Sequence, residues 1–213
     1  MEKLNIEYVC TGNNGRSPMA EAIAQDYVHS KGLEDRVLVT SSGSGLHELT
    51  KPSGEKGKKQ WIGIIELALK NGIYQESWRQ EEARRVIDTG MDVDDMALDQ
   101  CVFYAVNVEA MFRNMALFEI GLVAGGKYHK PTTTQAGRRV ILPMAGSNTK
   151  QVETIYAQGD LPMPQIVPLN QYVGLEGDIT NPFCQLLPVY QATRADLLKA
   201  VPMSVDKAVQ EYL

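Results

Sequence analysis

The sequence predicts an α/β fold in which a four-stranded parallel sheet carries helices on both faces. Short apolar runs alternate along the chain with longer segments of helical periodicity. A glycine-rich loop at residues 10–17 directly follows the first apolar run, where open α/β sheets bind ligands. A chain of 213 residues can bury one sizeable core, and we expect residues 1–213 to form a single domain.

The first part of the chain supplies two of the expected strands and three helices. The strands are predicted at 4–9 and 37–41, and the helices at 17–31, 57–71 and 76–86. Ser17 is a residue type that caps helices, and Pro18 suits the first helical position. A strand, a helix and another strand in this order indicate a crossover connection and a parallel sheet.

Residues 88–137 leave this alternation and are predicted to be an insertion. Five aspartates that lack calcium-loop spacing indicate a solvated acidic loop: Asp88, Asp92, Asp94, Asp95 and Asp99. An apolar helix is predicted at 108–123, with one stripe formed by Met111, Met115, Phe118 and Leu122 and a neighbouring one by Phe112 and Ala116. Two alternatives stay open: this helix packs on the main core, or it forms a dimer surface or a lid over the site.

The last part of the chain supplies the remaining two strands. They are predicted at 139–144 and 165–169, with a helix at 149–156, a loop at 174–182 and helical segments at 188–200 and 205–212. Pro168 cannot donate a ladder hydrogen bond, which favours an edge position for the fourth strand.

A cradle for a phosphate-like oxyanion is predicted at residues 10–17. Cys10 and Arg16 enclose five residues whose backbone amides can point at three oxygens, namely Thr11, Gly12, Asn13, Asn14 and Gly15. The following helix adds the positive end of its dipole, and Arg16 can hold two oxygens with its planar guanidinium. Such surroundings favour the thiolate form of Cys10, a nucleophile suited to attack phosphorus. The alternative for Cys10 is a buried structural thiol.

Composition limits the other possibilities. The net charge of −5 favours neither nucleic acid nor an anionic membrane, and no apolar run approaches the ~18 residues of a spanning helix. Three widely spaced cysteines, Cys10, Cys101 and Cys184, form no metal or disulfide pattern. We expect no signal peptide, no metal or other cofactor, no nucleic-acid or membrane partner, and a reducing cytoplasmic setting. The histidines are expected in loops or on the surface, with His47 as a candidate border of the cleft.

Residues 9–22, which read Val-Cys-Thr-Gly-Asn-Asn-Gly-Arg-Ser-Pro-Met-Ala-Glu-Ala, resemble the signature of the low-molecular-weight protein tyrosine phosphatases. Weaker matches follow in the family's order at 39–43, at 140–148 and at 178–183. The matching parts are roughly the first half of 1–85 and most of 138–200. The resemblance implies that family's fold and the hydrolysis of phosphotyrosine or a similar phosphomonoester through a phosphocysteine. The substrate would be a phosphorylated protein or a small phosphomonoester.

The resemblance also implies roles for individual side chains. Ser17 would donate a hydrogen bond to the thiolate, with helix capping as a compatible second role. Asn13 would brace the loop through Ser41. Phe183 would form an apolar wall beside the substrate, or else belong to the core. Asn14 holds a position where, in the family, a bulky aliphatic residue goes with phosphotyrosine and threonine with phosphoarginine.

Two departures from the family pattern concern the chemistry. Gly15 stands where the family usually has a second cysteine, and Asn181 stands where it has its general-acid aspartate. Asp178, three residues earlier, is the nearest carboxylate and becomes the candidate acid, unless it only hydrogen-bonds its own loop.

Two other functions remain as alternatives. An arsenate reductase uses a related fold, but it relays a disulfide through two further cysteines. A phosphate-binding pseudo-phosphatase could use the inserted helix for assembly, for example as a homodimer.

Overall fold

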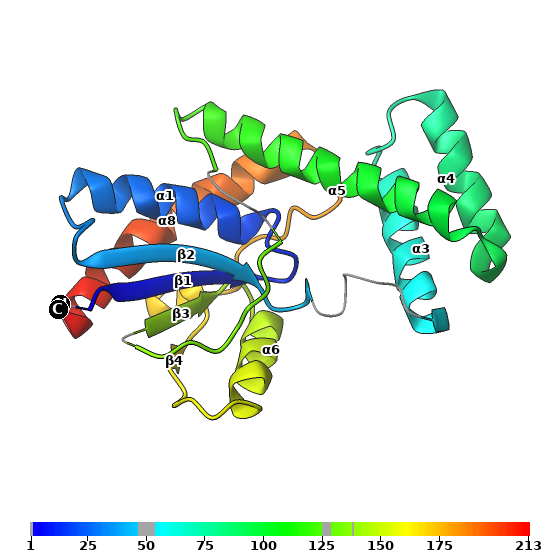
Figure 1. Ribbon diagram of the computed structural model, residues 1–213. Coiled ribbons are helices and arrows are strands. Elements are labelled where there is room, and N and C mark those ends of the chain that lie inside the picture. The colour runs from blue at the N-terminus through cyan, green and yellow to red at the C-terminus, as the bar shows by residue number, and fades with distance from the viewer. Residues whose placement is uncertain (1, 47–53, 125–128, 138) are drawn as a thin grey trace.

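A four-stranded parallel sheet forms the centre of the protein, as predicted (Figure 1). The computed structural model describes residues 2–46, 54–124, 129–137 and 139–213. Its strands are β1 (Leu4–Cys10), β2 (Val37–Gly43), β3 (Arg139–Pro143) and β4 (Gln165–Ile166), in the spatial order β2-β1-β3-β4. Strand β1 pairs with β2 from Leu4 opposite Val37 to Cys10 opposite Gly43, so both strands end together beside the predicted cradle.

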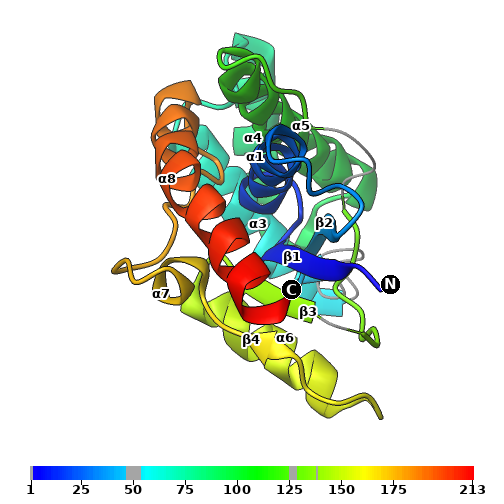
Figure 2. The same ribbon diagram turned by 90° about the vertical axis from the view of Figure 1, so that its left-hand side faces the viewer.

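Helices cover both faces of the sheet, which confirms the predicted layers (Figure 2). Helices α1 (Arg16–Ser30) and α8 (Leu187–Tyr212) lie on one face, and α6 (Gly146–Ala157) lies on the other. Adjacent residues of β1 point to opposite faces. The Tyr8 hydroxyl lies 2.9 Å from Oγ of Ser204 on α8, whereas Val9 packs with Val152 of α6.

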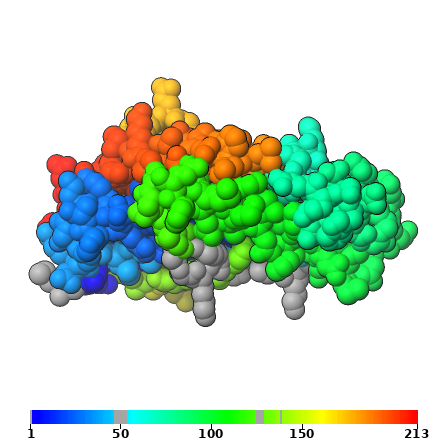
Figure 3. Space-filling view, turned by 90° about the horizontal axis from the view of Figure 1, so that it is seen from above, coloured from blue at the N-terminus to red at the C-terminus, as the bar shows by residue number. Residues whose placement is uncertain are grey.

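A helical lobe lies beyond the carboxyl ends of the strands (Figure 1). It consists of α3 (Gly54–Lys70), α4 (Ser77–Thr89), a 3-10 turn η1 (Gly90–Asp92) and the first half of α5 (Asp95–Phe118). Helix α5 runs from this lobe back over the helices that cover one face of the sheet, where it lies beside α8 (Figure 1 and Figure 3). The rings of Phe112 and Tyr190 meet there, with their centroids 5.9 Å apart. Helix α5 therefore joins the lobe to α8, which covers one face of the sheet (Figure 2).

The acidic stretch is solvent-exposed, as predicted, but the prediction of a loop is wrong, because most of that stretch is helical. Asp95 and Asp99 lie within α5, which starts thirteen residues earlier than the predicted helix at 108–123. Asp94 caps α5, since its carboxylate accepts hydrogen bonds from the backbone N–H groups of Met96 and Ala97 at 2.9 and 3.2 Å. Calcium-loop spacing was the wrong test, because an aspartate before an apolar run is also a helix start signal.

Two apolar stripes were predicted on the inserted helix, and the helix packs on the core through the shorter one. Phe112 and Ala116 are buried, whereas Met111, Met115 and Phe118 are exposed. The contact with α8 decides which face is inside. The packing alternative therefore applies to α5, although the same helix also lines a cavity described below.

Two predicted boundaries near the C-terminus are wrong. Strand β4 stops at Ile166, and Pro168 precedes a short helix, α7 (Leu169–Tyr172), that was not predicted. The two segments predicted at 188–200 and 205–212 form one helix, α8, which runs through Pro202. Buried Val201 and Val205 flank that proline, and their packing offsets the backbone hydrogen bond that it cannot donate. Within the described ranges, every helix falls short of the length and apolar character that a membrane crossing requires.

Candidate active site

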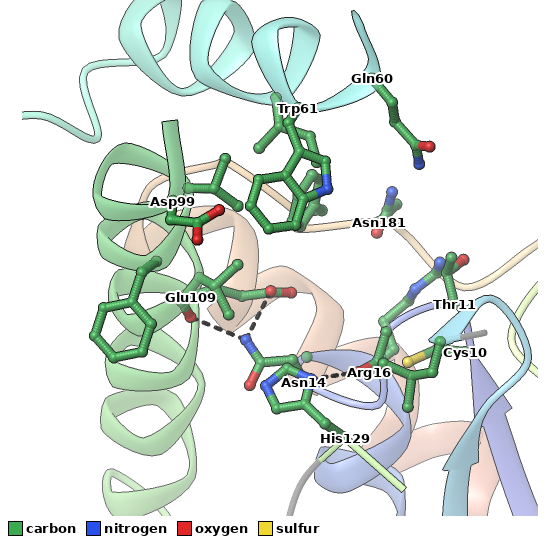
Figure 4. A pocket seen from close by; sticks show the side chains of 18 of the residues that line it. Cys10, Thr11, Asn14, Arg16, Gln60, Trp61, Asp99, Glu109, His129 and Asn181 are labelled. Atoms are coloured by element: carbon green, nitrogen blue, oxygen red, sulfur yellow. Dashed lines mark hydrogen bonds between the residues drawn. The ribbon is translucent and has the colours of Figure 1, made fainter. Parts of the chain in front are cut away.

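A cavity of about 740 Å³ opens where the carboxyl end of β1 faces α3 and α5 (Figure 4). Six residues of the predicted cradle line it, namely Cys10, Thr11, Gly12, Asn14, Gly15 and Arg16. An apolar wall faces them, formed by Leu46, Trp61, Ile64, Val102, Phe103, Val106 and Phe183. The predicted cradle is thus one end of a cavity whose other walls come from the helical lobe. The position agrees with the general rule for open α/β sheets.

Cys10 and Arg16 come together in this cavity. Sγ of Cys10 lies 3.0 Å from Oγ of Ser17, and the Cys10 side chain is buried at the end of β1. Arg16 is the first residue of α1, and its Nη1 donates to the carbonyl of Ile179 at 3.2 Å. The loop before Asn181 therefore holds the guanidinium beside the thiol, at the amino end of a helix that favours anions.

Asn13 and Ser17 brace the loop from behind. Asn13 has a left-handed backbone, with φ of 48°, which asparagine tolerates better than most residues. Its Nδ2 donates to Oγ of Ser41 at 2.8 Å and to Oγ of Ser17 at 3.1 Å. This is the arrangement that the family resemblance implies. Ser41 in turn donates to Glu21 at 2.6 Å, and burial, the largest cause, raises the pKa of that carboxyl.

The expected capping role of Ser17 is wrong. Helix α1 begins at Arg16 with Gly15 as its N-cap residue, and no side chain caps it. Ser17 already accepts a hydrogen bond from Asn13, so its own hydrogen is directed to Cys10 or to the Ser42 carbonyl at 3.2 Å.

A segment near the end of the predicted insertion contacts the cradle, and no local sequence pattern predicted this contact. The backbone N–H of Lys130 donates to Oδ1 of Asn13 at 3.0 Å, and Nδ1 of His129 lies 3.1 Å from the carbonyl of Gly12. His129 is the loop histidine expected from the sequence, but it also lines the cavity. His47, the candidate border of the cleft, lies outside the described residues.

The structure does not bring Asp178 to the cavity. Its carboxylate is exposed and accepts a hydrogen bond from the backbone N–H of Gly146 at 3.1 Å, at the amino end of α6. Asn181 and Phe183 do line the cavity. The half-buried Phe183 therefore lies where the expected apolar wall would be, whereas the expected acid is directed elsewhere.

Glu109 of α5 is a cavity residue that sequence reasoning missed. It is only 8% exposed, and its Oε2 accepts a hydrogen bond from Nδ2 of Asn14 at 2.8 Å. Asn14 also donates to the carbonyl of Val106, and Nη1 of Arg113 donates to the carbonyl of Asn14. Burial raises the pKa of Glu109, and the Asn14 hydrogen bond and the charges of Arg113 and Arg16 oppose that shift. An acidic residue among the apolar residues of a predicted helix was its only sequence signal.

The other two cysteines are buried and free. Burial raises the pKa of Cys101, and burial, with a smaller effect of Glu109, raises the pKa of Cys184 to about 12. Both side chains are therefore held as thiols at neutral pH. Within the described part of the chain, no three His, Cys, Asp or Glu side chains are grouped as metal ligands would be.

Comparison with known proteins agrees with this geometry. The family model described as low molecular weight phosphotyrosine protein phosphatase matches residues 5–82, a range that contains β1, the cradle, α1 and β2. Residues 5–82 of the chain therefore carry the sequence pattern of this family.

Curated relatives from the family match over part of their length. The low molecular weight protein-tyrosine-phosphatase YfkJ of Bacillus subtilis is 34% identical over 118 residues, which are 54% of this chain and 65% of that protein. The low molecular weight protein-tyrosine phosphatase A of Mycobacterium tuberculosis is 48% identical over 44 residues, which are 21% of this chain and 27% of that protein. The match thus spans less than two thirds of each of these relatives.

Solved structures of the family share the fold over nearly the whole chain. The crystal structure of YfkJ from Bacillus subtilis superposes with a TM-score of 0.59 at 16% identity and covers 100% of this chain and 99% of that one. The YwlE arginine phosphatase from Geobacillus stearothermophilus gives a TM-score of 0.52 at 21% identity, covering 98% and 94%. At these identities the likeness concerns the fold alone.

Proposed function

We propose that this protein is a cysteine-dependent phosphatase that hydrolyses phosphomonoesters, phosphotyrosine among them. One observation carries the proposal. The Cys10 thiol lies 3.0 Å from the Ser17 hydroxyl and shares one cavity with the Arg16 guanidinium. A nucleophile, a group that can stabilise its anion and a bidentate oxyanion ligand are thereby assembled at one helix amino end.

The reaction has two steps at this site. Sγ of Cys10 attacks phosphorus and forms a phosphocysteine, while the bond to the leaving oxygen breaks. Water then attacks the phosphocysteine, and inorganic phosphate leaves as the thiolate is restored. Arg16 and the backbone amides of the cradle hold the equatorial oxygens, whose charge is greatest in the transition state.

The cavity favours an apolar, ring-sized group on the ester oxygen. Trp61 and Ile64 of α3 and Val102 and Val106 of α5 line the side away from the cradle, and Phe183 completes the wall. Such a surface gains little from a sugar or a nucleotide, but it would cover an aryl group. We therefore propose an aryl phosphomonoester, on a protein or on a small molecule, as the substrate. A thiolate nucleophile needs a reducing setting, and we propose a cytoplasmic one.

The arsenate reductase alternative receives less support from the site. Its disulfide relay needs further cysteines that react as thiolates. Cys101 and Cys184 are instead buried, and their raised pKa values keep them protonated.

The helical insertion offers a surface to a second copy of the chain. Met111, Met115 and Phe118 stay exposed along α5 after the helix has packed on α8. We propose that two copies of the chain pair through this stripe.

Hydrolysis of p-nitrophenyl phosphate tests the proposed function. This ester has a good leaving group, so the cradle and Cys10 should suffice for turnover. Cys10→Ser should abolish turnover, whereas Cys101→Ser, a matched change at another buried cysteine, should leave it unchanged within a factor of about two, since that thiol lies outside the cavity. Phosphate binding without turnover would instead indicate a pseudo-phosphatase. Thiol-dependent reduction of arsenate would indicate the reductase.

A further inference from the structure

The leaving oxygen of an aryl ester needs a proton, and the family's acid position holds an amide, Asn181. Among the described residues that line the cavity, two carry carboxyl groups: Glu109 and Asp99. We propose that Glu109 of the inserted helix is the general acid of this enzyme, a role that rests on the phosphatase function proposed above.

The position of Glu109 favours it over Asp99. Glu109 reaches from α5 toward the cradle, where its Oε2 lies 2.8 Å from Nδ2 of Asn14 (Figure 4). Asp99 is exposed and lies ten residues earlier on the same helix, roughly 15 Å along its axis. Asp178 does not line the cavity, because its carboxylate accepts a hydrogen bond at the amino end of α6.

Two departures from the family pattern lie next to this carboxyl group, and a third lies in the same cavity. A side chain at Gly15 would begin only 2.7 Å from Oε1 of Glu109, so glycine leaves the space that the carboxyl group occupies. Asn14 holds the carboxyl group with its amide instead of presenting an aliphatic surface to the cavity. Asn181, which lines the same cavity, carries no acid. A single change, in which Glu109 takes over the role of the acid, accounts for all three departures.

The surroundings of Glu109 favour the protonated form of its carboxyl group. Burial is the dominant influence and raises its pKa. The charged groups that face it are Arg113 on α5 and Arg16 on α1, and both lower the pKa by a smaller amount. Tyr190 on α8 and Cys184 are the remaining titratable neighbours, and both have raised pKa values and stay neutral. General acids work best when their pKa lies near the working pH.

The proton follows a closed cycle. As Sγ of Cys10 bonds to phosphorus, the electron pair of the breaking P–O bond moves to the leaving oxygen, which takes the proton of Glu109. The alcohol leaves and Glu109 remains as a carboxylate. In the second step this carboxylate takes a proton from the attacking water. The P–S electron pair then returns to Cys10, and Glu109 is protonated again.

Esters of differing leaving-group acidity test this role directly. Phenyl phosphate needs a proton donor, whereas dinitrophenyl phosphate does not. Glu109→Gln keeps the size of the side chain and an oxygen that can accept from Asn14, but it cannot donate the acidic proton. We expect about a 10²- to 10⁴-fold loss of kcat with phenyl phosphate and less than about a threefold change with dinitrophenyl phosphate. Competitive inhibition by inorganic phosphate should be unchanged and reports an intact cradle.

Asp99→Asn and Asp178→Asn are the matched comparisons. Neither should make the rate more sensitive to the leaving group, and such an effect in either variant would overturn the assignment to Glu109. An equal loss of kcat with both esters in Glu109→Gln would also overturn the assignment, because such a result would show that Glu109 only positions the loop. Retained phenyl phosphate turnover in that variant would overturn the inference while leaving the phosphatase intact. Absence of Cys10-dependent turnover in the parent protein would overturn both.

Discussion

Sγ of Cys10 and Oγ of Ser17 lie 3.0 Å apart in a buried site at the amino end of α1. The hydroxyl oxygen also accepts a hydrogen bond from Asn13, which leaves its hydrogen available to the sulfur. A hydrogen bond to an ionised group is shorter and stronger than one between neutral groups. In the proposed mechanism, the Ser17 hydroxyl would therefore stabilise the attacking sulfur of Cys10.

Replacement of Ser17 by alanine should slow catalysis. A hydrogen bond to a charged group contributes about 1.5–3 kcal/mol, so kcat/KM for p-nitrophenyl phosphate should fall about 10- to 150-fold. Asn13 keeps its hydrogen bond to Ser41 in this variant. Ser30→Ala, at the exposed end of the same helix, should leave kcat/KM unchanged. Equal rates in Ser17→Ala and the parent would contradict the role of the hydroxyl.

A methyl group at Gly15 should be costly, because its space is taken by Glu109. The new Cβ would lie 2.7 Å from Oε1 and 3.6 Å from Cδ of that side chain. We expect Gly15→Ala to lower the free energy of unfolding by about 1–3 kcal/mol in urea titrations. Gly63→Ala is the control, since nothing lies within 4 Å of its Cβ, and it should be neutral or stabilising. Equal stability of the two variants would show that Glu109 moves aside freely.

The raised pKa of Glu109 predicts a pH dependence of stability. A carboxyl group that binds its proton more tightly in the folded state contributes most below its unfolded pKa of about 4.3, and this contribution is lost as pH rises through the folded value. The free energy of unfolding of the parent, relative to Glu109→Gln, should therefore fall as the pH rises above about 4.3. Glu119 is the comparison, because its pKa is lowered, mainly by a hydrogen bond from Arg194. The free energy of unfolding of the parent, relative to Glu119→Gln, should therefore change with pH in the opposite direction. If the difference in free energy of unfolding between the parent and Glu109→Gln does not change with pH, the raised pKa of Glu109 is contradicted.

The exposed stripe of α5 gives a prediction about assembly. Phe118 is 77% exposed at the end of this helix, next to Met115 and Met111 on the same face. If two copies pair through the stripe, Phe118→Ser should raise the dimer dissociation constant about tenfold or more in sedimentation equilibrium, without loss of p-nitrophenyl phosphate turnover. A dimer that Phe118→Ser leaves equally stable would place the interface elsewhere.

The parts of the fold that could be predicted from sequence are those whose signals are contiguous. Strand β1, the cradle and α1 follow one another within 30 residues, and each has its own local pattern of apolar runs, glycines and helix formers. The parallel sheet followed because strands and helices alternate. The segments predicted separately at 188–200 and 205–212 form one helix through Pro202, because the burial of the neighbouring helical residues outweighs a local helix breaker.

The unpredicted parts of the site come from long-range contacts. Asn14 and Glu109 are 95 residues apart in sequence, and Gly12 and His129 are 117 residues apart. Nothing in the pattern of an apolar helix tells which of its turns will face a loop on another element. Asp178 misled for the related reason that nearness in sequence to Asn181 does not place a side chain in the same cavity.

Trapping of the covalent intermediate tests the central claim most directly. Acid quenching during turnover of an aryl phosphate labelled at phosphorus should leave about one label per chain at most, attached to the peptide that contains Cys10. The label should be absent from Cys10→Ala. Turnover that proceeds with no labelled chain, or a label that persists in Cys10→Ala, would contradict the account.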